Sequence, residues 1–390
     1  MDPRVTKRQF ASLIPAALIS ISGCSKLPEQ LPKGVSGSVE NTDGEIKWIT
    51  ESEGYLPIFI QKLGGDRYLT GGKYYLTDAK YENVWHGILN AEGELISEVI
   101  RDDIQGAWYS GTPMPDGGFA LTGTVHNNEA NGMGAPRVAR YDENGDEVWS
   151  EVVREHPSSG DSTGECIVEI DDGHLVIIGE KAGDAVVMTK ISPDGSVVWN
   201  RIVYEGPNDP PASPERLLVH DGAIIAGLSG SFENPSVLVA MDPSGNELWR
   251  QRMEEGGVNI AMKGNDIFSA RADSESEETV VSMMNTEGTN KWETTLSKYY
   301  GGPISRYGDL GLTVLGGAGK RMWVGTFTDE GEMTADAIYG SATAKNKIIA
   351  DTVIRQDGDQ IACGNIQEGN SIIGWWGRLA KPKPQTTTES

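Results

Sequence analysis

The four residues Asp142-Glu-Asn-Gly145, followed by Trp149, are one copy of a pattern that recurs along the chain and decides its fold. Every copy has Asn, Asp, Ser or Thr at its first position and Gly at its fourth. A type I turn followed by a left-handed glycine requires this composition, so each copy is predicted to be a hairpin turn. The seven glycines are Gly44, Gly93, Gly145, Gly195, Gly245, Gly288 and Gly331. Their spacings of 49, 52, 50, 50, 43 and 43 residues are typical of a repeat architecture.

The segments around each turn have the composition of β-strands. An apolar run rich in β-branched residues precedes each internal turn, as at 186–191. A glycine-bounded strand lies upstream, as at 173–179, and a further strand leads into it, as at 107–113. Together with the strand after the turn, each repeat has four antiparallel strands, which describes a propeller blade. The sequence therefore predicts an all-β fold, a seven-bladed β-propeller over residues 40–380.

The two ends of the repeat region complement each other. The last repeat has predicted strands at 359–364 and 371–379 but no turn-and-Trp strand. The strand at 44–48 has no partner strand before it. We predict that residues 45–49 pair with 371–379, so that an N-terminal strand completes the last blade and closes the ring. Trp48 should then lie close to Trp376.

The turn followed by Trp resembles the PQQ-like family of β-propeller repeats, and the resemblance covers residues 40–380. It implies the fold and says little about activity. PQQ-dependent dehydrogenases share such repeats, but they also carry adjacent cysteines and a calcium-binding acidic set in a longer chain. Because this sequence has neither the adjacent cysteines nor that length, no cofactor is predicted.

The first forty residues read as an export signal and a tether. Residues 1–23 have a basic start, an apolar stretch too short to span a bilayer, and small residues before Cys24. The sequence Ile21-Ser-Gly-Cys24 resembles a bacterial-type lipobox, which implies lipidation of Cys24. Residues 6–10 are similar to a twin-arginine export signal in which Lys7 replaces the first arginine. Residues 24–39 are predicted to be a tether, and residues 381–390 a disordered tail.

The chain is strongly acidic. It has 57 Asp plus Glu against 33 Lys plus Arg, a formal charge of −24 at pH 7. Nucleic-acid binding is not expected, because it depends on Lys and Arg neutralising phosphates. An acidic surplus joined to this signal resembles the surface lipoproteins of haloarchaea, whose acidic surfaces stay soluble in high salt.

Tryptophan is the first candidate for a ligand-binding residue. Trp48, Trp149, Trp199, Trp249 and Trp292 each stand four residues after a turn glycine, and this recurrence predicts inter-blade core. Ser97 and Ala335 take that place in the other two repeats. A second set stands outside the repeat position, where stacking on a ligand should be tested first: Trp85, Trp108, Trp323, Trp375 and Trp376.

No catalytic or metal-binding residue is predicted. The histidines lack the pairing that places two imidazoles on one metal, and Cys166 and Cys363 are expected to be buried in non-adjacent blades. The acidic run 273–278 offers oxygen ligands for calcium, but its spacing matches no defined calcium loop and a solvated charge run is expected.

Three functions remain open. The leading hypothesis is a lipid-anchored extracytoplasmic scaffold on the outer face of the membrane, binding a protein or a cell-surface polymer. The alternative is an extracellular lyase, hydrolase or sulfotransferase whose site lies at the channel mouth. The third is a binder of calcium or a small ligand. Convergent carboxylates or histidines with perturbed pKa values at the channel mouth favour the enzyme, whereas a channel lined by small and apolar side chains favours the scaffold.

Overall fold

The fold is built from antiparallel β-strands. The computed structural model describes residues 42–75, 82–126, 134–153, 162–170, 173–181, 185–205, 213–230, 235–255, 257–273, 278–297, 300–307, 311–318, 321–340, 347–368 and 371–383. None of these residues forms a helix long and apolar enough to cross a membrane.

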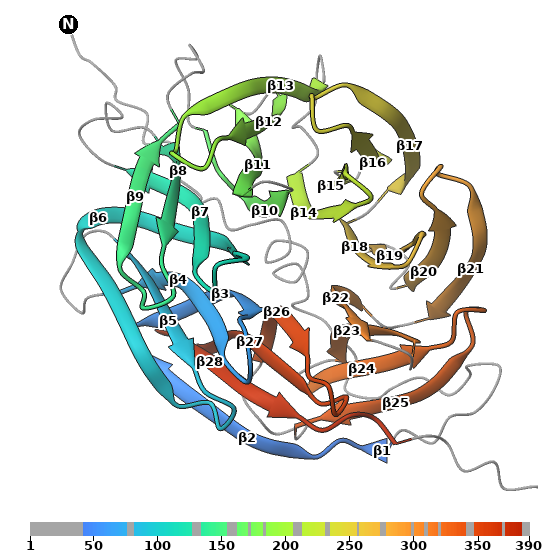
Figure 1. Ribbon diagram of the computed structural model, residues 1–390. Coiled ribbons are helices and arrows are strands. Elements are labelled where there is room, and N and C mark those ends of the chain that lie inside the picture. Colours follow the sequence, from blue (N-terminus) through green and yellow to red (C-terminus); the bar gives the residue numbers. More distant parts are fainter. Residues whose placement is uncertain are drawn as a thin grey trace, which may run out of the picture.

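Within this part of the chain, four-stranded sheets follow one another in sequence order. One sheet contains β10 (Cys166–Ile170), β11 (His174–Lys181), β12 (Ala185–Ile191) and β13 (Val197–Glu205). The next contains β14 (Ser213–His220), β15 (Ala223–Ser229), β16 (Pro235–Met241) and β17 (Glu247–Glu255). It is followed by β18 (Gly257–Lys263), β19 (Asp266–Asp273), β20 (Glu278–Asn285) and β21 (Asn290–Ser297). Figure 1 shows the sheets around a common centre, with the first strand of each innermost and the fourth outermost. The fold is therefore a β-propeller with four-stranded antiparallel blades.

A larger sheet joins two four-stranded units through one long strand. It contains β3 (Tyr55–Lys62), β4 (Tyr68–Tyr74), β5 (Asn83–Leu89), β6 (Leu95–Pro113), β7 (Phe119–His126), β8 (Gly134–Tyr141) and β9 (Glu147–Val152). The first part of β6 pairs with β5 and the part from Gly106 pairs with β7. Gly106 has a φ of 143°, and a Cβ there would lie 2.0 Å from the carbonyl oxygen of Thr124. The strand predicted at 107–113 is therefore the continuation of the preceding outer strand.

The N-terminal strands lie against the last sheets. One sheet contains β22 (Tyr300–Tyr307), β23 (Gly311–Ala318), β24 (Arg321–Phe327) and β25 (Met333–Tyr339), with β1 (Thr42–Asp43) parallel to β25. The other contains β26 (Lys347–Ile354), β27 (Gln360–Glu368), β28 (Ser371–Leu379) and β2 (Ile46–Glu53). In the β2–β28 pair, Thr50 stands opposite Trp376, and Trp48 packs into the same apolar cluster as Trp376. The predicted pairing of 45–49 with 371–379 is present.

The turns have the predicted geometry. In the turn 142–145, the N–H of Gly145 donates to the carbonyl of Asp142 at 3.1 Å, and Gly145 has a φ of 86°. The carboxylate of Asp142 accepts from the N–H groups of Asn144 and Asp146, both at 2.9 Å. The first-position side chain therefore fixes the turn, which explains why short polar residues recur there.

The two sets of tryptophans differ in burial, and the difference is the reverse of the one predicted. The recurrent set is half-buried on outer strands, where the rings of Trp48, Trp149, Trp199, Trp249 and Trp292 lie against Gly93, Gly195, Gly245, Gly288 and Gly331 of the following turn. These rings join neighbouring blades at the rim, so the prediction of inter-blade core was wrong about their depth. The fully buried rings belong to the other set: Trp85, Trp108, Trp323 and Trp375 are 0 % exposed and Trp376 is 3 % exposed. Trp85, Trp108, Trp323 and Trp375 therefore have no exposed surface on which a ligand could stack.

Candidate functional site: the central channel

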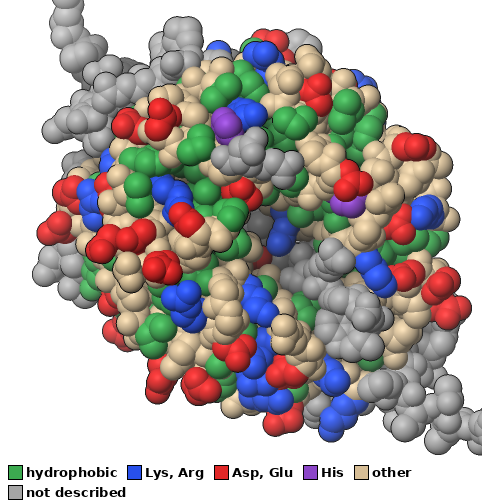
Figure 2. Space-filling view, viewed as in Figure 1, with side chains coloured by type: hydrophobic (Ala, Val, Ile, Leu, Met, Phe, Trp, Pro, Cys, Tyr) green, Lys and Arg blue, Asp and Glu red, His purple; other side chains and the backbone are tan. Residues whose placement is uncertain are grey.

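The central channel holds a cavity of about 240 Å³. Its walls come from innermost strands, namely β3, β6, β10, β14, β18 and β26. Figure 2 shows the molecule hollowed at the centre of one face. Side chains from blades far apart in the sequence therefore meet in one small space.

β-Bulges place side chains in this channel. The pairing register shifts at Ile58 in β3, Tyr109 in β6, Glu215 in β14 and Ala350 in β26, and all four residues line the cavity. A bulge leaves one residue outside the ladder and redirects its side chain. Glu165, just before β10, stands at a similar place: its N–H donates to the carbonyl of Ile178 at 2.8 Å.

Three glutamates meet on one side of the channel. Glu165 and Glu215 line the cavity, and Glu180 of β11 stands beside them. Oε1 of Glu165 accepts a hydrogen bond from Thr163 at 3.0 Å, and Oε1 of Glu180 accepts one from Ser213 at 2.6 Å. Oε2 of Glu165 is buried and has no hydrogen-bond partner among the described residues.

Burial shifts the acidity of all three carboxyl groups in the same direction. For Glu215, burial and then the nearby Glu180 charge raise the pKa to about 7 against an opposing hydrogen bond from Ser229. Burial, with the charges of Glu180 and Glu215, raises the pKa of Glu165 well above its ordinary value. Burial also raises the pKa of Glu180, opposed by the Ser213 hydroxyl. Near neutral pH this side of the channel therefore retains protons that exposed glutamates would lose.

The cavity wall also carries an ion pair between non-adjacent blades. Arg216 of β14 lies 3.8 Å from Oδ1 of Asp351 in β26. Asp351 also accepts hydrogen bonds from the N–H groups of Ile60 at 2.9 Å and Thr352 at 2.8 Å. Burial nevertheless raises the pKa of Asp351, against the opposing effects of Arg216 and these amides. This pair ties β14, β26 and β3 together around the cavity.

The channel has convergent carboxyl groups, the feature expected of an enzyme, and also apolar lining, the feature expected of a scaffold. Its carboxyl groups converge and have raised pKa values, which suits general acid–base chemistry near neutral pH. The remaining wall mixes apolar side chains such as Ile58 and Leu217 with polar ones such as Thr112. The arrangement can bind a small ligand that has one polar end, and it can donate or accept a proton there.

The histidines are not part of this site in the described chain. His86 is buried against Phe119 and Tyr141, and burial, with the Arg101 charge, lowers its pKa to about 3. His220 contacts Oδ1 of Asn265 at 2.7 Å, away from the cavity lining. Cys166 and Cys363 are free and buried, as predicted.

The described residues contain no group of three or more His, Cys, Asp or Glu side chains suited to a metal ion. The acidic run 273–278 falls mostly outside them, since only Asp273 and Glu278 are described, as paired strand ends. Cys24 also lies outside the described residues.

Sequence reasoning missed Glu165, Glu180 and Glu215. A usable signal was present, because Glu165 stands directly before the apolar residues of β10, and Glu215 precedes the apolar run 217–219 within β14. A glycine stands on the second strand close to each of the two glutamates, Gly179 in β11 and Gly227 in β15. At Gly179, an added Cβ would lie 1.8 Å from the carbonyl oxygen of Thr163.

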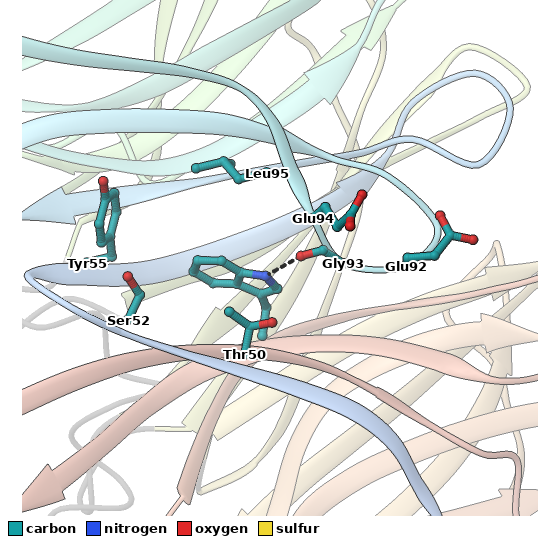
Figure 3. A pocket seen from close by; sticks show the side chains of 8 residues that line it. Thr50, Ser52, Tyr55, Glu92, Gly93, Glu94 and Leu95 are labelled. Atoms are coloured by element: carbon teal, nitrogen blue, oxygen red, sulfur yellow. Dashed lines mark hydrogen bonds between the residues drawn. The ribbon is translucent and has the colours of Figure 1, made fainter.

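A second hollow of about 390 Å³ lies at the seam between the first and last repeats. Figure 3 shows its lining, which includes Thr50, Ser52, Tyr55 and Glu94. Nε1 of Trp376 donates to the carbonyl of Gly93 at 3.0 Å and closes one side of it. This contact links β28 to the turn before β6.

Comparison with known proteins identifies no family. No protein-family model matches the chain, and no curated protein matches it. The PQQ-like character of the repeats therefore stays a prediction.

Among solved structures, the chain is similar to other propellers. The Dos1 propeller matches at 10 % identity and a TM-score of 0.52, over 88 % of this chain and 96 % of that one. BBS1N, solved in complex with ARL6DN, matches at 11 % identity and 0.52, over 86 % and 97 % of the two chains. BamB from Moraxella catarrhalis matches at 14 % identity and 0.47, over 86 % and 99 %. At these identities the likeness shows the fold alone.

Proposed function

We propose that this protein is a lipid-anchored, extracytoplasmic β-propeller that acts as a scaffold for a protein partner at the outer face of the membrane. The anchor is supported by the order of basic, apolar and small residues ahead of Cys24. We also propose seven PQQ-like blades in a ring closed by β2. Seven turn glycines and the β2–β28 pairing support that count and that closure.

A row of exposed apolar side chains on the outer strands carries the scaffold proposal. Each member stands directly before the repeated Trp position: Ile96 is 54 %, Val148 59 %, Val198 51 % and Leu248 55 % exposed. In the other repeats this place is taken by Lys47, Lys291 and Thr334. Large apolar side chains exposed at one repeated place on sheet edges favour contact with another protein.

The row is tested by crosslinking the tagged protein on cells and identifying the captured partner by mass spectrometry. The double variant Val148→Asp with Val198→Asp should lose the partner captured by the wild type. Thr334→Asp is the matched control, because Thr334 is exposed at the same repeat position outside the row. Equal capture by the double variant and the wild type would contradict the proposal.

The anchor has a separate test. Cys24→Ser should release the protein from membranes into the medium, measured by fractionation and immunoblotting. Retention of the variant on the membrane would overturn the lipid anchor and leave the fold and the apolar row unaffected.

The channel carboxyl groups favour an extracellular hydrolase as a second candidate function. Glu215, with a pKa of about 7, is suited to give up or accept a proton, and Glu165 lines the same cavity. A substrate screen of the purified protein tests this. Hydrolysis that is lost in Glu215→Gln and retained in Glu143→Gln, a change in an exposed turn, would support the enzyme. Unchanged hydrolysis in Glu215→Gln would exclude this site as its source.

A further inference from the structure

We propose that the channel cavity binds a small organic cation, a primary ammonium group on a short apolar body, with the ammonium group held between Glu165 and Glu215. The inference does not depend on what the outer strands bind. It also holds whether the channel only binds the ligand or transforms it.

The cavity is sized for a short ligand. Its volume of about 240 Å³ equals the liquid volume of about eight water molecules. A four-carbon amine fits this space, whereas a folded peptide segment does not. Six strands contribute to the lining, namely β3, β6, β10, β14, β18 and β26.

The glutamate side of the cavity provides unused acceptor capacity. Oε2 of Glu165 is buried with no hydrogen-bond partner among the described residues. A buried acceptor left unpaired costs free energy, so such an atom in a cavity wall indicates a missing donor. An ammonium group supplies three donors and no acceptor. Glu215, brought to the cavity by its bulge, provides the second carboxyl group.

The charge balance selects a cation. Among the side chains that the structure describes, the titratable and charged groups around the ammonium position are Glu165, Glu180, Glu215, Tyr109, Cys166, Arg216 and Asp351. Arg216 is the one cation among them, and it lies 3.8 Å from the Asp351 carboxylate. A bound cation would relieve the repulsion among the three glutamates, whereas an anion would add to it.

The rest of the wall suits an organic ligand. Phe59, Ile167 and Leu217 provide apolar surface for a short hydrocarbon body. Tyr109 also lines the cavity, and aromatic rings attract organic cations. Gln61, Thr112 and Asn259 also line the cavity and can hydrogen-bond a polar group of the ligand.

Calorimetric titration with three ligands of equal length tests the proposal on the purified protein in its native salt. The ligands are n-butylammonium, 1-butanol and butyrate. At pH 8 we expect n-butylammonium to bind and the neutral and anionic ligands not to bind. From pH 8 to pH 6 the affinity should fall about tenfold, because Glu215, with a pKa of about 7, takes up a proton that opposes cation binding. Binding near pH 7 should release protons, seen as different heats in buffers of different ionisation enthalpy.

Variants locate the site. Glu165→Gln and Glu215→Gln should each weaken n-butylammonium binding by about tenfold or more, and Glu215→Gln should abolish the proton release. Glu143→Gln, in an exposed turn, should bind as the wild type does. The glutamine variants should remain folded, because they remove buried charge. No binding of n-butylammonium, equal binding of 1-butanol, or unchanged binding by both variants would each overturn the proposal.

Discussion

A tryptophan ring resting on a glycine joins neighbouring blades at the rim. Trp292 lies against Gly331 so closely that an added Cβ would be 2.7 Å from its ring. Nε1 of Trp292 also donates to the carbonyl of Asp329 at 2.6 Å. The indole therefore packs on the turn and binds its backbone, which explains why the turn glycine and the Trp recur together.

Gly331→Ala should be more destabilising than Gly340→Ala. Both glycines have a positive φ, 85° and 93°, so each alanine costs about 1–2 kcal/mol in backbone strain. Gly340 faces open space, whereas Gly331 faces the Trp292 ring, which adds about 1–3 kcal/mol of overpacking. Denaturant unfolding measures the difference. Equal free energies of unfolding for the two variants would show that the ring contact is not tight.

The recurrence of Trp was sufficient to predict contact between repeats but not the depth of that contact. An outermost strand packs on fewer neighbours than a middle strand, and local sequence does not say which strand is outermost. Trp108 and Trp375 stand outside the position after the turn, yet they are 0 % exposed because they lie on strands covered on both faces by other blades. The burial of a Trp side chain therefore depends on the position of its strand within the blade, and local sequence does not reveal that position.

At the scale of the element, several innermost strands pair with the second strand of the blade through a β-bulge. The sequence predicted a strand leading into each glycine-bounded strand. It did not predict the bulges, because a bulge depends on the register with the second strand rather than on the first strand alone. Glu215 shows the consequence, since a one-residue shift between Pro214 and Arg216 brings its carboxyl group to the channel.

Glu215→Gln should change how stability depends on pH. Folding raises the pKa of Glu215 from 4.5 to about 7. The stability contributed by this group is therefore fully present below pH 4.5 and is lost as the pH rises through 7, by up to about 3 kcal/mol. Glutamine does not titrate. Thermal unfolding should show that the melting temperature of the variant rises relative to that of the wild type between pH 5 and pH 8.

The exposed Glu143→Gln change provides the control for this pH series, and its curve should run parallel to that of the wild type. If the Glu215→Gln curve also ran parallel to the wild type, Glu215 would titrate as an exposed glutamate. The bulge would then not hold its carboxyl group away from water.

At the scale of the whole molecule, the two ends of the propeller are tied together. The ring of Tyr339 lies against Gly44, and its hydroxyl donates to the carbonyl of Ala380. The N–H of Ala380 donates to the carbonyl of Glu45 at 2.9 Å. The complementary ends of the sequence were sufficient to predict that β2 pairs with β28. The pairing of β1 with β25 could not be predicted, because a strand of two residues has no periodicity.

A buried carboxylate strengthens this seam. Asp359, whose side chain is 5 % exposed, binds Lys47 of β2 at 2.8 Å and Arg378 of β28 at 2.6 Å. Burial acts to raise the pKa of Asp359, but hydrogen bonds from Lys47, the Lys381 amide and Arg378 outweigh burial and hold the pKa below its ordinary value. The seam therefore gains stability above the unfolded pKa of Asp359, about 4, and loses it as the pH falls through the folded pKa.

Asp359→Asn should loosen the N-terminal strand much more than Asp357→Asn does. Both carboxylates bind Arg378, but the Asp357 side chain is 45 % exposed and has water as an alternative partner. Loss of the buried carboxylate should cost about 2–3 kcal/mol, against less than about 1 kcal/mol for the exposed one. Hydrogen exchange of the β2 amides should rise in Asp359→Asn at pH 7, and this difference from the wild type should shrink at acidic pH as Asp359 is protonated. Exchange that rises equally in both variants would mean that Arg378, and not the bridge from Lys47 to Asp359, holds β2 on the last blade.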